Sequence, residues 1–287
     1  MVTAVVRVPA SSANLGPGFD ALGMVLGLHA EAGFVGDDPL PERAHPADER
    51  HPASVAFRRA GGEGQLWVRC SIPMGRGMGY SGAVRVAGLV AAHLQHHGAD
   101  ESDDSLAAAR EEWLATSAEL EGHADNVAAS IYGGVVATAA GRAVRVPLPI
   151  DPVVVLWVPS ATTSTDESRA ALGAPVEFAD AVFNVGRTAL LVAALAAGDV
   201  GALRSATEDR LHQEARFQAA ASSKDALATA LSAGAWCGWL SGSGPTVATL
   251  CPKDAVDAVS DALGSLPDPA STKVLRIDHA GAVIETI

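Results

Sequence analysis

The sequence is poor in cysteine. Its 287 residues include three, Cys70, Cys237 and Cys251, and no two of them have C-x-x-C spacing. A structural zinc site usually takes four closely spaced Cys or His ligands, and a disulfide framework takes an even number of cysteines. The pattern argues against both. Free thiols are typical of a reducing compartment.

Positive charge is also scarce. Lys and Arg total 20 against 33 Asp and Glu, a net charge of −13, and no basic stripe offsets it. Such a surface repels a phosphate backbone, so nucleic acid is a poor candidate partner and a small solute is a better one. With 48% hydrophobic and 18% charged residues and no repeat, the composition is typical of a globular protein.

Long apolar runs are missing as well. The first seven residues, MVTAVVR, lack the basic flank and apolar region of a secretory signal. The longest weakly apolar stretch, residues 127–140, is too short to span a bilayer and contains Gly133 and Gly134. We therefore expect a cytoplasmic protein without a membrane partner.

The order of apolar and turn residues predicts an α+β protein. A strand over residues 2–8, ended by Pro9, enters a loop over residues 10–20, and residues 36–52 form a surface loop. Strands over residues 65–72, 134–139 and 143–146 and helices over 105–120 and 125–131 follow. Beyond residue 152 we expect a strand over 153–158, helices within 177–198 and over 200–212 and 223–233, then strand, strand, helix and strand.

Three prolines between residues 147 and 152 interrupt this pattern. Domain boundaries fall in such segments. The sequence therefore predicts an N-terminal domain, residues 1–150, and a C-terminal domain, residues 151–287.

Residues 75–83, GRGMGYSGA, lie between a predicted strand and a predicted helix with apolar residues at helical spacing. A glycine-rich turn that opens a helix presents free backbone N–H groups to an anion. The run matches neither the P-loop nor the Rossmann fingerprint, so a phosphate site and a plain tight turn are equally good interpretations of this segment alone.

A second polar run, residues 119–126 (ELEGHADN), lies at the start of a predicted helix. Asp125 is placed to cap that helix, which is its simplest explanation. The remaining polar groups exceed what a cap needs, and a carboxylate such as Glu121 can hold Mg²⁺, whose shell phosphate and water complete.

These motifs together resemble the homoserine kinases, a family in the superfamily of galactokinase, mevalonate kinase and phosphomevalonate kinase. Residues 12–20 (SANLGPGFD) and 121–127 (EGHADNV) resemble the family's opening and central motifs. Three later signatures follow in order: residues 165–169 (TDESR), His212-Gln213 with Arg216, and residues 240–246 (LSGSGPT). The resemblance spans nearly the whole chain.

The resemblance implies a fold, an activity and a set of site residues. The fold is a ribosomal S5 domain 2-like nucleotide-binding domain followed by a ferredoxin-like substrate domain, with the active site between them. The activity is phosphorylation of the side-chain hydroxyl of L-homoserine by ATP with Mg²⁺, a step of threonine biosynthesis. The implied substrate ligands are Asn14 and Asp20 for the amino end and Arg169 and Arg216 for the carboxylate.

The other implied roles concern the reacting groups. Ser81 and Glu121 correspond to Mg²⁺ ligands, and Asp125, Asn126 and Thr165 lie near the reacting hydroxyl. The implied ATP phosphate loop consists of Gly75, Gly77, Gly79, Tyr80, Ser81, Gly82 and Ala83. Family members of this kind use no dedicated carboxylate base, because an amide such as Asn126 orients the hydroxyl and the loose transition state of phosphoryl transfer depends on positioning and charge.

The chain departs from the family pattern at two positions. Tyr80 replaces the first serine of the phosphate loop, where it is expected to crowd the helix entrance, and Ser54 occupies the position of an asparagine that touches adenine. Three interpretations stay open: a homoserine kinase, a related kinase for another hydroxy acid, and a degenerate member that binds amino acid without catalysis. A homodimer and a nucleotide other than ATP also stay open.

Overall fold

The computed structural model describes residues 4–37, 39–99, 103–170, 172 and 175–286. Its first sheet has seven strands, and all their pairings are antiparallel. They are β1 (Ala4–Ala13), β2 (Leu22–Phe34), β3 (His45–Pro46), β4 (Leu66–Cys70), β5 (Val135–Ala139), β6 (Arg142–Val146) and β11 (Val283–Thr286). The order is β11-β1-β2-β4-β3, and β5 joins β2 to β6.

Pro9 does not end the first strand, contrary to the sequence prediction. β1 continues to Ala13, and its register against β2 shifts between Pro9 and Ala10. Proline is tolerated at such an irregularity because the ladder is already interrupted there. Part of the predicted loop is therefore strand, while Val2 and Thr3 of the predicted strand lie outside the described residues.

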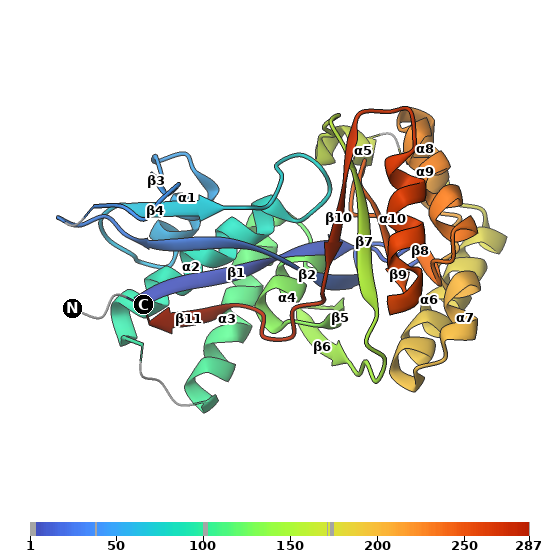
Figure 1. Cartoon of the computed structure of the whole chain (residues 1–287). Coiled ribbons are helices and arrows are strands. Elements are labelled where there is room, and N and C mark those ends of the chain that lie inside the picture. The colour runs from blue at the N-terminus through green and yellow to red at the C-terminus, as the bar shows by residue number, and fades with distance from the viewer. Residues whose placement is uncertain (1–3, 38, 100–102, 171, 173–174, 287) are drawn as a thin grey trace.

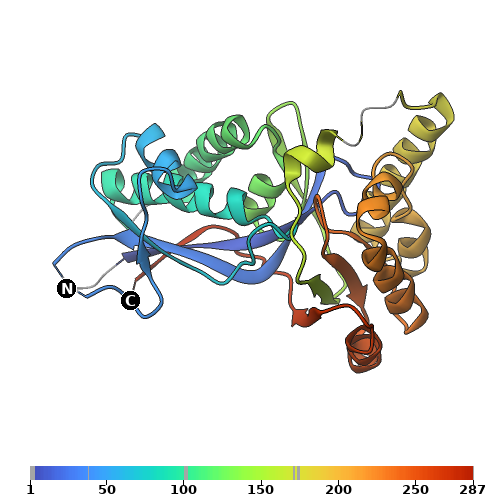
Figure 2. The same cartoon turned by 90° about the horizontal axis from the view of Figure 1, so that it is seen from above.

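Four helices lie on one face of this sheet (Figure 2). They are α1 (Pro52–Arg59), α2 (Tyr80–His97), α3 (Asp103–Glu121) and α4 (Asp125–Tyr132). Small residues allow α2 to approach its neighbours closely, since a Cβ on Gly88 would come within 2.1 Å of the Ala53 carbonyl oxygen in α1. This packing points the start of α2 toward the second half of the molecule (Figure 1).

The second sheet has four antiparallel strands, with helices on one side of it (Figure 1). Its strand order is β10 (Ala270–Leu275), β7 (Val153–Pro159), β9 (Val247–Cys251), β8 (Cys237–Leu240). The helices of this half are α5 (Thr165–Ala170), α6 (Phe178–Ala197), α7 (Val200–Ala206), α8 (Gln213–Ala219), α9 (Ala221–Ser232) and α10 (Val256–Gly264), with a short 3₁₀ helix η1 (Lys253–Ala255).

One buried core joins the two halves. Leu22 of the first sheet and Leu156 and Trp239 of the second belong to the same hydrophobic cluster. The indole N–H of Trp239 also donates to the Ser12 hydroxyl at 2.9 Å. The two sheets with their helices agree with the two-domain α+β class predicted from the sequence.

The chain does not divide cleanly at residue 150. Its last described strand, β11, returns to the first sheet and pairs with β1 from Ala4↔Thr286 to Arg7↔Val283. Residues beyond 151 thus contribute to both sheets, which a single cut cannot represent. The boundary at residue 150 stays a prediction.

Helix α6 exposes much of its apolar surface. It is the one helix, among the residues that the structure describes, long and apolar enough to cross a membrane by length and composition, and 22% of its 18-residue window is buried. One such helix is weak evidence for a membrane span.

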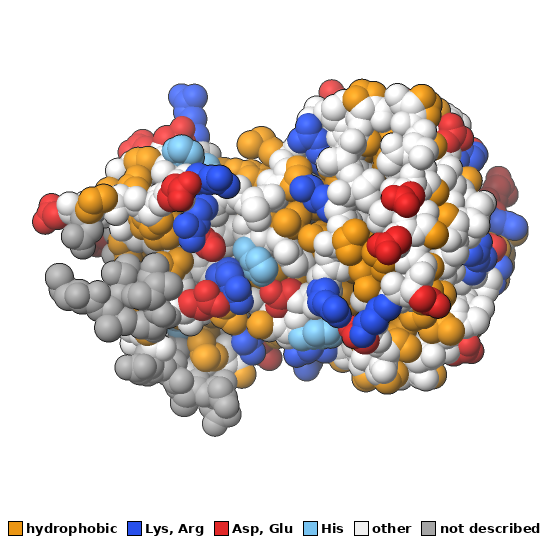
Figure 3. All heavy atoms as spheres, in the orientation of Figure 1, with side chains coloured by type: hydrophobic (Ala, Val, Ile, Leu, Met, Phe, Trp, Pro, Cys, Tyr) orange, Lys and Arg blue, Asp and Glu red, His pale blue; other side chains and the backbone are white. Residues whose placement is uncertain are grey.

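On the face of the molecule shown in Figure 3, basic side chains are interspersed with acidic ones.

Candidate active site

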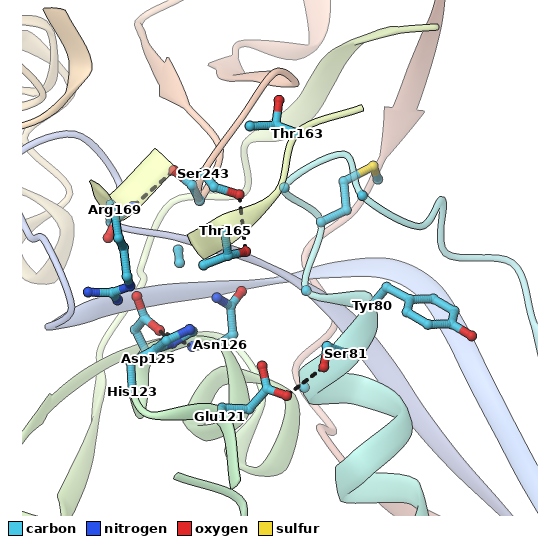
Figure 4. A pocket seen from close by; sticks show the side chains of 18 of the residues that line it. Tyr80, Ser81, Glu121, His123, Asp125, Asn126, Thr163, Thr165, Arg169 and Ser243 are labelled. Carbon is cyan, nitrogen blue, oxygen red and sulfur yellow. Dashed lines mark hydrogen bonds and ion pairs between the residues drawn. The ribbon is translucent and has the colours of Figure 1, made fainter. Parts of the chain in front are cut away.

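A cavity of about 200 Å³ lies where the glycine loop, the start of α4 and the loop after β8 meet (Figure 4). Every site residue predicted from the sequence lines it except Ala83, which is fully buried in α2. The Ala83 amide donates to the Gly79 carbonyl oxygen, so it belongs to the helix and is not free for an anion. Ser54 is buried within α1 and does not line the cavity either.

The glycine loop has the backbone that an anion site needs. Gly75, Gly77 and Gly79 have φ values of 67°, 67° and 68°, a region that disfavours residues with a Cβ. Gly79 caps α2 without a side-chain hydrogen bond, which leaves the first N–H groups of an 18-residue helix facing the cavity. The positive end of the helix dipole adds to this attraction for phosphate.

The Gly77 position also requires glycine sterically. A Cβ there would lie 2.1 Å from the Ser241 carbonyl oxygen, and the Ser241 hydroxyl donates to the Gly77 carbonyl oxygen at 2.6 Å. The loop after β8 therefore holds the glycine loop in place. This contact joins two motifs that the sequence analysis treated separately.

Tyr80 does not crowd the helix entrance, contrary to the sequence expectation. Its ring points away from the centre of the cavity (Figure 4), and its hydroxyl lies 3.4 Å from Nε2 of His51. A side chain in the first turn of a helix projects outward from the axis while the amides point along it, so the two need not compete. Partial burial raises the pKa of the Tyr80 phenol.

Ser81 and Glu121 converge from α2 and α3. The Ser81 hydroxyl donates to Glu121 Oε1 at 2.6 Å, and the Arg85 guanidinium Nε donates to the same oxygen. The other carboxylate oxygen points into the cavity (Figure 4). A hydroxyl and a carboxylate are the hard oxygen donors that Mg²⁺ takes, so the residues present fit this ion.

Asp125 and Asn126 begin α4, but Asp125 is not its N-cap. The cap is Ala124, without a side-chain hydrogen bond, and Asp125 is the first helical residue. Its Oδ1 accepts from the Asn126 amide and lies 2.7 Å from His123 Nδ1, so the carboxylate does part of the work of a cap from inside the helix. The hydrogen bond that His123 Nδ1 donates to the Asp125 carboxylate raises the pKa of His123.

The Asn126 side chain is oriented by Ser11, whose hydroxyl donates to Asn126 Oδ1 at 2.9 Å. With its oxygen engaged there, the amide has its NH₂ group left for a ligand in the cavity that Asn126 lines. Across the cavity, Thr165 begins α5, and its Oγ1 lies 3.5 Å from Oγ of Ser243 in the loop after β8. These groups surround the space in front of the glycine loop (Figure 4).

Asp20 and Arg169 form a two-pronged ion pair. Arg169 Nη1 and Nη2 donate to the two Asp20 oxygens at 3.0 and 2.5 Å, although the residues are 149 positions apart. The pair raises the pKa of Arg169. The family resemblance implies that these residues bind opposite ends of a substrate, whereas in the structure they are bonded to each other.

Arg216 carries a buried charge of the site, at 6% exposure. Its Nη1 donates to the Gly242 carbonyl oxygen at 2.9 Å and lies 3.0 Å from His212 Nδ1. Burial, and then the nearby positive charge of Arg169, lower its pKa to about 10. The guanidinium therefore stays charged at neutral pH and is poorly compensated, which favours an anionic ligand.

His212 holds Arg216, and Phe19 packs against both arginines. His212 Nε2 lies 2.7 Å from the Gly16 carbonyl oxygen, which requires the proton on Nε2 and leaves Nδ1 as an acceptor for Arg216. Burial lowers the pKa of His212 and keeps the ring neutral. The guanidinium carbons of Arg169 and Arg216 lie 5.3 and 5.2 Å from the Phe19 ring centroid, a cation–π arrangement.

Asn14 connects the loop that carries Asp20 to the loop after β8. Its Nδ2 donates to the Gly242 carbonyl oxygen at 3.1 Å, and its Oδ1 accepts from the Asp20 amide. Both ends of the amide are thus engaged by backbone. The geometry favours a role in fixing the loop around Asp20, in addition to the predicted contact with substrate.

Asp20, His123 and Asp125 also lie close enough to share a cation, with ligand atoms within 4.8 Å of one another. Each already has a charged or hydrogen-bonding partner, Arg169 for Asp20 and the His123–Asp125 contact for the other two. The Arg169 charge directly beside this group opposes a metal ion. The metal ligands implied by the resemblance, Ser81 and Glu121, stay a prediction.

Comparison with known proteins decides the family. Residues 51–134 match the GHMP kinases N terminal domain, and residues 191–267 match the GHMP kinases C terminal domain. A homoserine kinase of Gloeobacter violaceus is 38% identical over 98% of this chain and 98% of its own, and one of Streptomyces avermitilis is 40% identical over 97% and 94%. The chain belongs to the homoserine kinase family of GHMP kinases. A homoserine kinase structure from Cytophaga hutchinsonii shares its fold, with a TM-score of 0.83 at 24% identity over 99% of this chain and 98% of the other.

Membership of this family confirms that the chain is a phosphotransferase acting on a hydroxyl group, with ATP as the phosphoryl donor.

Sequence reasoning gave no role to five residues around the cavity, which are Ser11, Phe19, Arg85, His123 and His212. His123 and His212 stood inside recognised motifs, which was a usable signal. Ser11 and Arg85 act through contacts between distant segments, so no local pattern marked them.

Proposed function

We propose that this chain transfers the γ-phosphoryl group of ATP to the side-chain hydroxyl of L-homoserine, a step of threonine biosynthesis. The observation that carries the proposal is the set of charges on one side of the cavity. Asp20 is paired with Arg169, and the guanidinium groups of Arg169 and Arg216 both lie against the ring of Phe19, so the cavity offers one carboxylate and two guanidinium groups there. An amino acid presents the complementary set, one ammonium and one carboxylate.

The ion pair between Asp20 and Arg169 supports a specific binding mode. The zwitterion replaces this pair, so that its ammonium takes Asp20 and its carboxylate takes Arg169 together with Arg216. Guanidinium groups bind a carboxylate through two parallel hydrogen bonds, which fixes its plane as well as its charge. Arg216 is rigidly held, whereas Arg169, with 36% of its side chain exposed, is free to change partner.

The opposite side of the cavity suits the nucleotide. We assign the phosphates to the glycine loop and the first turn of α2, and Mg²⁺ to Ser81 and Glu121. When bound, the ion neutralises charge that develops on the transferring phosphoryl group. Tyr80 flanks this region from outside, so its replacement of a serine is compatible with phosphate binding through backbone amides.

The reacting hydroxyl lies between these two sides, near Asn126 and Thr165. Asn126 donates to the hydroxyl oxygen through Nδ2 because Ser11 holds its Oδ1. The Asp125 carboxylate is already engaged by His123 and a backbone amide, so it serves to hold the start of α4. Positioning and charge stabilisation supply most of the acceleration when the transition state is loose.

One assay tests the assignment against its alternatives. ADP release is measured with Mg-ATP or Mg-GTP against L-homoserine, threonine, serine and pantoate. The proposal expects L-homoserine with ATP to give the highest kcat/KM. A preference for another acceptor indicates a related kinase for that hydroxy acid. If no acceptor gives ADP release but the protein binds amino acid in a calorimeter, the chain is a member of the family that has lost catalysis.

Location and assembly are further proposals. Three free cysteines, of which Cys237 and Cys251 are buried, support a cytoplasmic protein. Exposed apolar side chains at Phe178, Val182 and Val185 of α6 support a homodimer through that helix. Light scattering of the wild type and of Val185→Glu tests the dimer, which the variant should dissociate.

A further inference from the structure

Arg85 lies against the carboxylate that the proposed function assigns to the metal. It stands four residues after Ser81 on α2, so both side chains lie on the same face of that helix. From this face the Ser81 hydroxyl and the Arg85 guanidinium both donate to Glu121 Oε1. The Arg85 and Glu121 side chains are 20% and 10% exposed.

The two sides of the Glu121 carboxylate therefore differ. Oε1 accepts both hydrogen bonds, while the other oxygen faces the cavity (Figure 4). A guanidinium in contact cancels most of the charge that would attract a divalent cation, and at this low exposure solvent screens it little. Arg85 also fixes the plane of the carboxylate, because Nε donates along a defined direction.

We propose that Arg85 is a positioning residue that keeps Glu121 aimed at the cavity but too weakly charged to bind a free divalent cation. The metal then enters together with the nucleotide, whose phosphates restore the missing negative charge. Mg²⁺ suits this order because it typically binds through one or two carboxylates plus substrate phosphates. This inference rests on the proposed metal role of Glu121 and extends it to the order of binding.

A second arginine–glutamate pair at the same end of α3 provides a matched control. Arg59 of α1 donates to both oxygens of Glu119 at 3.3 Å, two positions before Glu121. The side chains of Arg59 and Glu119 are 56% and 66% exposed, and neither residue lines the candidate active-site cavity. Arg59→Met therefore removes the same kind of charge without touching the site.

The experiment measures binding of Mn²⁺ to the full chain without nucleotide, from the paramagnetic resonance signal of free Mn²⁺. We expect Arg85→Met to bind Mn²⁺ at least about tenfold more tightly than the wild type, since a unit charge beside the ligand is gone. Arg59→Met should match the wild type. Arg85→Met combined with Glu121→Gln should lose the gain, which locates the new affinity at Glu121.

Two further variants separate charge from shape. Arg85→Lys keeps the charge and should bind Mn²⁺ as weakly as the wild type. Arg85→Gln removes the charge and should bind Mn²⁺ as tightly as Arg85→Met. It replaces Arg85→Met in the experiment if the methionine variant does not fold. With a non-hydrolysable ATP analogue present, the difference between wild type and Arg85→Met should shrink severalfold. Equal Mn²⁺ affinity of wild type, Arg85→Met and Arg85→Gln without nucleotide overturns the proposal.

These outcomes are independent of the acceptor assay. Tight Mn²⁺ binding by Arg85→Met with no turnover of L-homoserine by the wild type would support the role of Arg85 and reject the proposed acceptor. Normal turnover with unchanged Mn²⁺ affinity would do the reverse.

Discussion

The ion pair between Asp20 and Arg169 makes the proposed binding mode testable with a single amide substitution. Asp20 has a φ of 56°, in the left-handed region that asparagine also tolerates, so Asp20→Asn keeps the backbone. The change removes the charge that we assign to the substrate ammonium. It also releases Arg169 from its present partner.

The magnitude follows from these two opposing effects. A hydrogen bond to a charged group contributes about 1.5–3 kcal/mol. The Asp20 side chain is 37% exposed, which places the loss near the lower end of that range. Freeing Arg169 offsets roughly 0.5 kcal/mol, the scale of a partly exposed ion pair. The net loss of roughly 1–2 kcal/mol corresponds to a five- to thirtyfold fall in kcat/KM for L-homoserine.

A substrate analogue isolates the ammonium contact. 4-Hydroxybutyrate has the hydroxyl and carboxylate of homoserine but no amino group, so its kcat/KM should rise by about twofold in Asp20→Asn, because Arg169 is released for the carboxylate. The preference for homoserine over the analogue should therefore fall about ten- to sixtyfold. Asp180→Asn is a suitable control, since Asp180 pairs with Arg210 at 36% exposure of its side chain and lies outside the cavity. An unchanged preference in Asp20→Asn would refute the assignment and leave Asp20 as a turn residue.

Three further predictions concern the supports of the site. Burial lowers the pKa of His212 below its ordinary 6.5, so below pH 6.5 the unfolded state binds a proton that the folded state does not. The free energy of unfolding should therefore fall as the pH falls below 6.5. In thermal melts, His212→Gln should lack this part of the pH dependence. Gly77→Ala should lower stability and nucleotide affinity more than Gly64→Ala. Both glycines have a positive φ, but a Cβ at Gly77 would clash with the Ser241 carbonyl oxygen, whereas a Cβ at Gly64 meets nothing within 4 Å. Equal losses of stability in urea unfolding would contradict the contact with Ser241. Tyr80→Phe should change the Kd for ATP by less than about twofold in nucleotide titrations, because the Tyr80 hydroxyl lies at the long distance of 3.4 Å from His51 Nε2 and faces away from the loop amides. A larger change would place the phenol at the phosphates.

Most residues of the candidate site could be predicted from the sequence because they stand in short motifs. The glycine loop and the run around Glu121 carry their chemistry locally, as glycines before a helix and carboxylates at a helix start. The pairing of Asp20 with Arg169 could not be predicted, since 149 positions separate them and only the packing of the two halves brings them together. The same holds for Arg85, which any helical pattern assigns to an ordinary polar position.

The fold was predictable where periodicity was clean. The predicted strand over residues 153–158 corresponds to β7 (Val153–Pro159), and the helix over 105–120 corresponds to α3 (Asp103–Glu121). The 13-residue strand β2 was missed, because its glycines and its nearly continuous burial hide the alternation expected of a strand. A Cβ on Gly23 within it would lie 2.3 Å from the Asp125 carbonyl oxygen, so tertiary packing sets that residue.

The predicted helix over residues 200–212 is wrong in its second half. α7 ends at Ala206, and the Asp209 carboxylate then accepts the backbone N–H groups of Leu211, His212 and Gln213. Such side-chain bonds compete with helical ones and make a turn. The short helices α5 and α8 were not predicted, since six or seven residues carry too little periodicity.

Transfer of the γ-phosphoryl group of ATP to the hydroxyl of homoserine can be followed without a coupled assay. Phosphorus NMR of a mixture of the protein, Mg-ATP and L-homoserine measures this directly. We expect a phosphate monoester signal, split by the two protons of the adjacent methylene group, to grow as the γ-phosphate signal of ATP declines. A γ-phosphate that declines while only inorganic phosphate appears, or that stays constant while the protein is folded and binds ATP, would contradict it.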